Sequence, residues 1–411
     1  MWIGVGLNVL LLAYFKYVDF FIGNFNFVTD SKWDTLGIAI PLGISFFTFQ
    51  QIAYVVDCSE GRADKCSFSD YALFVSFFPQ LIAGPIVHHR EMMPQFKAPD
   101  SMKVDIENVI RGGSLFVIGL AKKVVVADSL ATYANNVFAS ADEATLISSW
   151  LGALAYTFQL YFDFSGYSDM AIGAARIFNI KIPFNFDAPL RSPNIIEFWR
   201  RWHITLSNFI TSYIYTPMVR AWGKFSLSYS LISLVLTMLI AGLWHGAGWT
   251  FVIFGGINGV ALAVNHYWRH RRYGMPRVLG IVLTFLTFMI SLVWFRAESC
   301  GVALDLLAGM VGLHGVALPA SLAGWLNGIG LGSVMEGNTF AYLTDWGFRG
   351  DILEFFFFFM VAVLLAFFGK SSHKLAYEMP LTSRNAVFLG LLTTLAVVHL
   401  KNAKVFLYFQ F

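Results

Sequence analysis

Residues 225–268 form a stretch of 44 residues that contains no lysine, arginine, aspartate or glutamate. About 20 consecutive apolar residues suffice for one helix to cross the hydrocarbon core of a bilayer, so this stretch is long enough for two spans. Backbone polar groups in lipid must be satisfied within the protein, and a helix does this within one segment. The stretch therefore predicts a polytopic integral membrane protein of the all-α class.

The composition of the whole chain supports this class. Of its 411 residues, 57% are hydrophobic and 13% are charged, whereas globular chains carry about 25% charged residues. Too few polar residues are present to coat a soluble globule of this size. The net charge is +3 and no basic tail or arm is present, so no nucleic-acid partner is expected.

Roughly ten apolar segments are candidates for membrane-spanning helices, and re-entrant or interfacial pieces are expected besides. The ten cover residues 2–22, 36–57, 71–88, 110–127, 146–162, 228–244, 248–267, 278–295, 353–368 and 385–400. The first lacks a small-residue cleavage site, so we expect a retained helix rather than a signal peptide. The chain shows no internal repeat, which weakens a transporter interpretation.

The loop at 269–277 indicates how the chain is oriented. It carries four arginines and no acid, and such loops face the cytoplasm. Residues 248–267 then run towards the cytoplasm. His245, just before them, lies across the membrane from that loop, or partway down if the helices are broken and tilted.

His245 is the most informative residue of the uncharged stretch. It lies between two tryptophans in AGLWHGAGWTF (241–251), whose glycines favour close backbone approach or a break. Broken backbone at membrane depth occurs beside protein or a water-filled cavity, and ionisable residues there are usually functional. Burial lowers the pKa of an imidazole, so a neutral ring is available to take a proton from a hydroxyl. A general base is one role; a proton relay, a metal ligand and a haem ligand are alternatives.

Metal and serine chemistry have little support in the sequence. No HExxH motif occurs, the three cysteines form no ligand pattern, and the adjacent His88 and His89 cannot bind one metal from one helix face. FSGYSD at 164–169 does not match a GxSxG nucleophile elbow. No metal site is therefore expected.

A second polar region follows a run of prolines. After Pro183, Pro189 and Pro193, which interrupt helices, residues 195–215 predict a helix whose aromatic stripe includes Phe198 and Trp202. One interpretation is an interfacial amphipathic helix with snorkelling arginines, which spacing alone favours modestly. The other is a re-entrant helix that lines a cavity, where arginines bind an anionic group such as phosphate.

Five segments together resemble the membrane-bound O-acyltransferase (MBOAT) family. They are SFFPQLIAGPIV (76–87), YFDFSGYSDMAIG (161–173), FWRRWHITLS (198–207), GLWHGAGWTF (242–251) and the terminal YFQF (408–411). The resemblance is greatest to the bacterial branch that contains the alginate O-acetylation membrane protein and the teichoic-acid D-alanyl transfer protein. It covers nearly the whole chain and implies a single transmembrane domain over residues 1–411.

The resemblance implies a site and a reaction. His245 and His203 correspond to the family's two histidines, and His245 would be the general base at the centre of a membrane-crossing funnel. The family transfers an acyl group from a thioester donor, coenzyme A or a carrier-protein phosphopantetheine, to a hydroxyl. Acetyl is the acyl group expected here, and no tightly bound cofactor is expected.

Four further residues acquire candidate roles from the same resemblance. Arg200 and Arg201 are candidates to bind the donor's phosphate, or else to anchor a helix at the cytoplasmic surface. Trp199 and Trp244 are candidates to line the cavity, or else to pack in the core. Asp163, Tyr167 and Asp169 of YFDFSGYSDMAIG (161–173) belong to a family motif for which we expect structural hydrogen bonding.

The resemblance also implies a location and partners. It places the chain in the bacterial cytoplasmic (inner) membrane, with an extracytoplasmic esterase-like partner protein and an exported glycan, such as an alginate-like exopolysaccharide, as acceptor. Many relatives have an Arg-Asp pair where this chain has Thr211 and Ser212, and a Gly-Gly-Asn-Arg loop where it has TPMVRAWGK (216–224). The acceptor is therefore not carried over.

Other interpretations stay open from the sequence. The chain could be a transporter or flippase in which His245 relays protons, or a catalytically idle scaffold, although the intact WHG motif argues against a scaffold. Relatives usually have a further apolar segment before the match to GVGLNVLLLAYFKY (4–17), so the chain is either a short member or truncated at its start.

Overall fold

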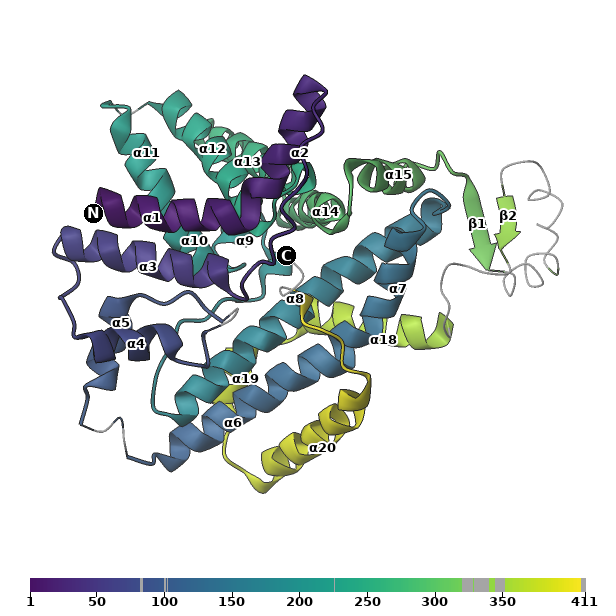
Figure 1. Cartoon of the computed structure of the whole chain (residues 1–411). Helices are drawn as coiled ribbons and strands as arrows, with labels where there is room; N and C mark the ends of the chain where they lie inside the picture. Colours follow the sequence, from purple (N-terminus) through teal and green to yellow (C-terminus); the bar gives the residue numbers. More distant parts are fainter. Residues whose placement is uncertain are drawn as a thin grey trace.

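A computed structural model describes residues 1–81, 84–99, 101, 103–224, 226–319, 328, 340–343 and 352–407 (Figure 1). Within these ranges the secondary structure is helical, apart from one pair of short parallel strands, β1 (Val316–Pro319) and β2 (Phe340–Leu343), with Val316 opposite Phe340. The predicted all-α class is confirmed. YFQF at 408–411 lies outside the described residues.

The helices follow one another along the chain, and η denotes a short 3₁₀ or π segment. They are α1 (Trp2–Leu12), η1 (Ala13–Tyr17), α2 (Val18–Thr29), α3 (Ile44–Ser59), α4 (Phe68–Ser76), α5 (His89–Phe96), α6 (Ile106–Ala121), η2 (Lys122–Ala127), α7 (Asp128–Ala139), α8 (Leu146–Ile177), η3 (Pro189–Arg191), α9 (Ile195–Trp199), α10 (Ile204–Ile210), η4 (Thr211–Tyr215), α11 (Thr216–Ala221), α12 (Leu227–His245), α13 (Trp249–His270), α14 (Arg277–Arg296), α15 (Cys300–Met310), α18 (Ile352–Phe368), α19 (Ser372–Glu378), α20 (Ser383–His399) and η5 (Leu400–Asn402).

Five of the described helical segments are long and apolar enough to cross a membrane, which supports a multi-pass membrane protein. They are 2–29, 227–245, 249–270, 277–296 and 383–402. A sixth results if α18 and α19, bent by 71° at a short break, form one span. The predicted number of roughly ten stays a prediction.

Two of the predicted spans differ from the observed helices. Residues 71–88 do not form one helix, because α4 ends at Ser76 and residues 77–81 and 84–88 are not helical. Pro79 and Pro85 lie there, and proline lacks the N–H that a helix needs. In the segment 36–57, helix α3 begins only at Ile44, after Gly43 adopts a left-handed conformation (φ 73°).

The core is built on α8, a helix of 32 residues. Helix α6 lies along it, and both run diagonally across Figure 1. A Cβ atom added at Gly119 would lie 2.5 Å from the carbonyl oxygen of Gly166, and one at Gly112 would lie 2.6 Å from that of Gly173. The two backbones therefore approach as closely as small residues allow, which is a common way to pair helices in membranes.

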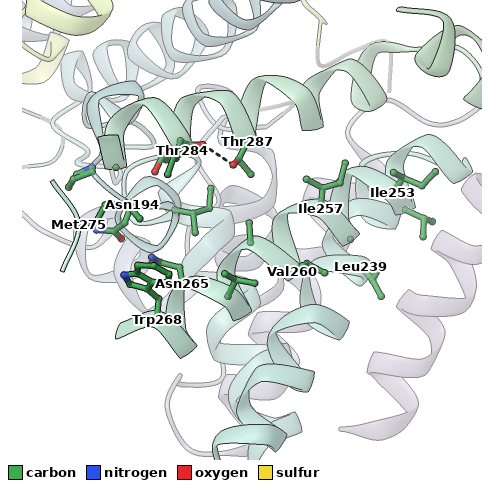
Figure 2. Close-up of a pocket in the computed structure, with 18 of the residues that line it drawn as sticks. Asn194, Leu239, Ile253, Ile257, Val260, Asn265, Trp268, Met275, Thr284 and Thr287 are labelled. Carbon is green, nitrogen blue, oxygen red and sulfur yellow. Dashed lines mark hydrogen bonds between the residues drawn. The ribbon is translucent and has the colours of Figure 1, made fainter. Parts of the chain in front are cut away.

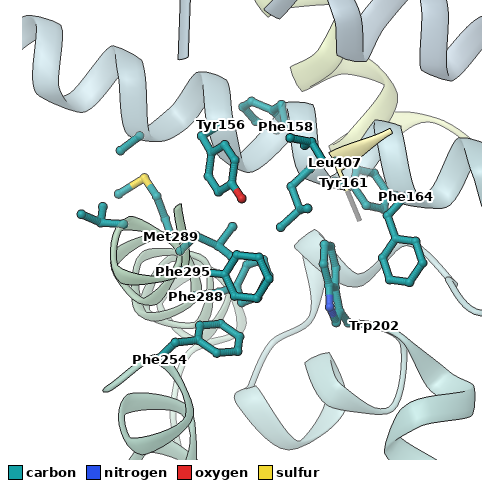
Figure 3. Close-up of a cluster of buried hydrophobic side chains, with 14 of the residues drawn as sticks. Tyr156, Phe158, Tyr161, Phe164, Trp202, Phe254, Phe288, Met289, Phe295 and Leu407 are labelled. Atoms are coloured by element: carbon teal, nitrogen blue, oxygen red, sulfur yellow. The ribbon is translucent and has the colours of Figure 1, made fainter. Parts of the chain in front are cut away.

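Aromatic side chains connect α8 and α14 to the segment between α9 and α10. Trp202 lies 4.8 Å from Phe288 and 6.1 Å from Tyr161, measured between ring centroids. Figure 3 shows Trp202 between the α8 aromatic residues and those of α14. The segment that carries the RWH motif is therefore packed inside the protein, which the interfacial-helix interpretation did not anticipate.

Candidate functional site

The RWH motif forms a break between two helices. α9 ends at Trp199, α10 begins at Ile204, and His203 between them has a left-handed backbone (φ 44°). The prediction of one continuous helix over 195–215 is therefore wrong. The reason is nonlocal: the N–H of Ile204 donates to the backbone oxygen of Asn185 (3.0 Å), and the hydroxyl of Thr205 donates to the Asn185 side-chain oxygen (2.7 Å).

The same asparagine orients His203. Nδ1 of His203 lies 3.4 Å from Oδ1 of Asn185. Oδ1 also accepts the backbone N–H of Thr205 at 3.2 Å, so this atom is the amide oxygen and Nδ1 of His203 is the donor. The ring is 1% exposed and meets the edge of Phe164 at 4.7 Å and the ring of Trp244 at 6.5 Å. His203 is therefore held rigidly inside the core.

His245 is the last residue of α12 and is buried among aromatic rings. Its ring centroid lies 4.9 Å from that of Trp244, 5.2 Å from Phe295 and 5.9 Å from Phe254. Because Trp244 touches both histidines, the structure brings together the RWH and WHG motifs, which are 42 positions apart.

The end of α12 is held by residues of η1 that sequence reasoning missed. Nζ of Lys16 donates to the carbonyl oxygens of Trp244 (2.6 Å) and His245 (2.9 Å), and the Tyr17 hydroxyl donates to that of Leu243 (2.8 Å). The last carbonyls of a helix lack intrahelical partners and form the negative end of its dipole, so a buried ammonium suits them. The available signal was a lone lysine inside the first apolar segment.

A cavity of about 380 Å³ lies beside His245, which we call the central cavity. Its lining residues from α12 are Leu234, Thr237, Met238, Ala241 and His245, and those from α13 are Phe254, Leu262 and His266. The segment from α9 to η4 contributes Ile196, Trp199, Arg200, Leu206, Ser207, Asn208, Ile210, Thr211 and Tyr215. The α12 residues recur every three or four positions and so share one face.

The central cavity has His245 at one end and positive charge towards the other. Leu234 lies 11 positions before His245, which is about 16 Å along a helix at 1.5 Å per residue. On the antiparallel α13, Phe254 lies beside His245, and His266 follows 12 positions later, about 18 Å away. Arg200 acts electrostatically on the ring of His266, so these two side chains lie near each other.

The six predicted site residues divide into two groups. His245, Trp199 and Arg200 line the central cavity, whereas His203, Trp244 and Arg201 are not among its lining residues. Trp244 stacks on Phe49 at 5.0 Å and packs in the core. Arg201 forms an ion pair with Glu197 one turn earlier. The roles predicted for all six stay predictions.

Comparison with known proteins identifies the family. The model of the membrane-bound O-acyltransferase family, MBOAT, matches residues 59–276, more than half of the chain. The chain belongs to the MBOAT family. The match includes both histidines and every residue that lines the central cavity. A single domain over residues 1–411 stays a prediction.

Relatives within the MBOAT family are named for peptidoglycan, alginate or teichoic acid. The chain is 46% identical to the peptidoglycan O-acetyltransferase of Helicobacter pylori, over 77% of this chain and 66% of that protein. It is 40% identical to the "Probable alginate O-acetylase AlgI" of Pseudomonas aeruginosa (73% and 58%) and 27% identical to the teichoic acid D-alanyltransferase of Bacillus subtilis (59% and 65%). The chain spans between about half and two thirds of the length of the curated relatives it matches.

The two acidic residues of YFDFSGYSDMAIG (161–173) in this MBOAT protein form structural hydrogen bonds, as predicted. Asp163 forms an ion pair with Lys123 (3.0 Å) and accepts the backbone N–H of Leu407 (3.1 Å). Asp169 pairs with Lys122 (2.7 Å). Both carboxylates therefore tie α8 to neighbouring segments and lie away from the central cavity.

A second polar cluster, also missed from the sequence, lies on η4 and the end of α3. The Tyr213 hydroxyl donates to Asp57 (2.8 Å) and lies 3.3 Å from Nδ1 of His88, and Arg62 pairs with Asp57 (3.1 Å). Burial lowers the pKa of the His88 imidazole, against the opposing effect of Glu91. The cluster anchors η4, whose Thr211 and Tyr215 line the central cavity.

Proposed function

We propose that this MBOAT protein is a membrane O-acyltransferase that moves an acyl group, acetyl above all, from a cytoplasmic thioester donor to a hydroxyl of an exported polysaccharide or partner protein, with His245 as general base. One observation carries the proposal: His245 and Arg200 line the same cavity. His245 lies at the turn of the hairpin formed by α12 and α13, and Arg200 lies towards the other end of that hairpin. This separation suits a long thioester donor, whose thioester would lie at His245 and whose phosphate would lie at Arg200.

The base would act as follows. A neutral His245 imidazole takes the proton of the acceptor hydroxyl while the oxygen attacks the thioester carbonyl. The C–O bond forms, the C–S bond breaks, and the leaving thiolate takes the proton from the imidazolium. The aromatic rings around His245 would keep bulk water away from the thioester.

Charge and orientation indicate which end of the cavity would bind the donor. Arg200 and His266 lie towards the end of α13 that leads to the arginine-rich loop, which is expected in the cytoplasm. Arginine binds phosphate with two parallel hydrogen bonds. Coenzyme A and carrier-bound phosphopantetheine both carry phosphate, so either donor fits as a substrate, without a tightly bound cofactor. Arg200 is the arginine proposed for this contact, because Arg201 pairs with Glu197.

His203 is proposed as a positioning residue. It does not line the central cavity, but its ring lies against Trp244, which in turn contacts His245. Asn185 holds it through Nδ1. Trp199, which lines the cavity, is proposed to contact the donor's acyl or pantetheine portion.

The names of the relatives guide the choice of acceptor. Two of the three named relatives are acetyl-transferring enzymes, and identity is greater to the peptidoglycan enzyme than to the alginate enzyme, 46% against 40%. We propose a bacterial envelope glycan of the peptidoglycan type as acceptor, reached directly or through an extracytoplasmic esterase-like partner. The location proposed is the bacterial cytoplasmic membrane.

The test is acetyl transfer by the purified chain in proteoliposomes, with radiolabelled acetyl-CoA and either peptidoglycan fragments or alginate oligomers. His245→Ala is expected to abolish transfer while donor binding persists, and His399→Ala, at a half-buried histidine at the end of α20, is the matched control. Equal transfer by wild type and His245→Ala would remove His245 as the base. Movement of the glycan across the bilayer without an acylated product would favour the transporter alternative.

A further inference from the structure

A second, larger hollow lies on the other side of α13 from the central cavity. It has a volume of about 880 Å³ and runs between α13 and α14, and we call it the outer groove. Figure 2 shows Leu239, Ile253 and Ile257 at one end and Asn265, Trp268 and Met275 at the other. The two hollows lie on different faces of α13, so the outer groove is separate from the proposed reaction site.

The outer groove opens on the exposed surface of two membrane-spanning helices, α13 and α14. Val260 and Val264 of α13, which line it, are 54% and 58% exposed, and Leu283 of α14 is exposed as well. The described part of the chain therefore covers only about half of the surface of these side chains. At membrane depth, an apolar groove of this kind is in contact with lipid acyl chains.

One end of the groove is basic. Arg271 directly follows α13, three positions after the lining residue Trp268, and Arg277 is the first residue of α14, three positions before the lining residue Gly280, so both lie at this end of the groove. Both arginines are exposed, and residues 269–277 contain no acid. The groove is therefore apolar along its length and cationic at the end that is expected to face the cytoplasm.

A polar atom lies at the same end. Asn265 lines the groove, and its Oδ1 is buried without a hydrogen-bond donor among the described residues. A buried acceptor without a partner is unfavourable, so a hydroxyl or amine of an occupant would improve its environment.

We propose that the outer groove binds a phospholipid with an anionic headgroup, its acyl chains between α13 and α14 and its phosphate at Arg271 and Arg277. Juxtamembrane arginines attract anionic lipids of the cytoplasmic leaflet, and the apolar length of the groove suits acyl chains. Asn265 then accepts a hydrogen bond from the headgroup or glycerol portion. This binding is independent of acyl transfer and is measured without turnover.

The experiment uses the full chain, extracted from membranes that contain phosphatidylglycerol and phosphatidylcholine, with retained lipid counted by native mass spectrometry. Gly256→Leu fills the groove, since a Cβ at Gly256 has only Cδ2 of Leu239 nearby, at 3.5 Å. Gly6→Leu is its control, because no atom lies within 4 Å of a Cβ there. Arg271→Gln with Arg277→Gln removes the charge, and Arg220→Gln with Lys224→Gln, exposed residues just before α12, is the matched control.

Retained phosphatidylglycerol is expected to fall roughly tenfold in Gly256→Leu and in the Arg271/Arg277 variant, and to stay unchanged in both controls. Three results would overturn the proposal. Gly256→Leu could retain as much phosphatidylglycerol as Gly6→Leu, wild type could retain the two lipids equally, or Gly256→Leu could change the oligomeric state without changing retained lipid. The last result would identify the groove as a surface between copies of the chain.

Discussion

At the scale of single residues, the position of His245 depends on Lys16, which lies 229 positions earlier in the chain. The lysine ammonium and the Tyr17 hydroxyl together bind three successive carbonyls at the end of α12. A general base must lie within about 3 Å of the proton that it takes. A small shift of the helix end therefore affects catalysis before it affects folding.

Lys16→Met is expected to lower kcat for acyl transfer while leaving the donor KM nearly unchanged. The change leaves the Trp244 and His245 carbonyls without the Lys16 ammonium as donor, which costs about 1–3 kcal/mol. If the transition state bears this cost, the rate falls about fivefold to 150-fold. Lys16→Arg should restore part of kcat, and the exposed Lys32→Met should have no effect. Steady-state kinetics of the four proteins measures this, and a wild-type kcat in Lys16→Met would contradict it.

Arg200→Gln is expected to weaken donor binding about tenfold or more, because a hydrogen bond to a charged group contributes about 1.5–3 kcal/mol. Arg201→Gln should have a small effect, since Arg201 pairs with Glu197 away from the central cavity. The comparison of acetyl-CoA with acetyl-pantetheine, which has no phosphate, isolates the contact. If Arg200→Gln weakens binding of both thioesters equally, the phosphate assignment is wrong.

At the scale of elements, α12 and α13 form a hairpin whose glycines let the helices touch. A Cβ at Gly255 would meet the backbone of Met238 and Gly242, whereas one at Gly256 would meet only a flexible leucine side chain at 3.5 Å. Backbone cannot move aside as a side chain can. The hairpin carries His245 at its turn and lines the central cavity along its length, so helix spacing and site geometry are coupled.

Gly255→Ala is expected to destabilise the protein by about 1–3 kcal/mol, as overpacking does, and to reduce acyl transfer. Gly256→Ala at the neighbouring position is the matched control and should behave like wild type. Thermal unfolding in detergent, followed by circular dichroism, and the transfer assay measure the two effects. Equal melting temperatures for the two variants would show that the helices are not in the close contact described.

At the scale of the whole molecule, the segment after α20 returns to α8. Lys123 pairs with Asp163 (3.0 Å) and Asp128 (2.5 Å), and Lys404 accepts from Lys123 through its carbonyl oxygen (3.0 Å). Leu407 donates its N–H to Asp163. These buried charges join three distant parts of the chain, and removal of one partner leaves the others without compensation.

Lys123→Met is expected to cost about 3–5 kcal/mol of stability, because two buried carboxylates lose their cation. Lys97→Met is the control: Lys97 also forms an ion pair, with Asp70 at 3.2 Å, but its side chain is 62% exposed, and such pairs contribute about 0–1 kcal/mol. Thermal unfolding of both variants measures the difference in their stability. A similar melting temperature for the two would mean that the Lys123 network does not hold the segment after α20.

Hydrophobic length and composition were sufficient to predict several features. The all-α membrane class, the helix pair of residues 227–270 and the break next to His245 all follow from local properties: apolar runs long enough for a bilayer, and glycines at a turn. The motifs that resemble the MBOAT family also placed His203 and His245 in one site before any distance was known, and the structure connects them through Trp244.

The tertiary structure alone decided which side chains face the central cavity. Arg200 and Arg201 are adjacent and chemically identical, yet one lines the cavity and the other pairs with Glu197. That difference depends on the break at His203, which hydrogen bonds from Asn185 hold open. A hydropathy pattern describes how a segment partitions between water and lipid. It contains no information about which distant segment supplies a hydrogen bond, and such nonlocal contacts determine the geometry of this site.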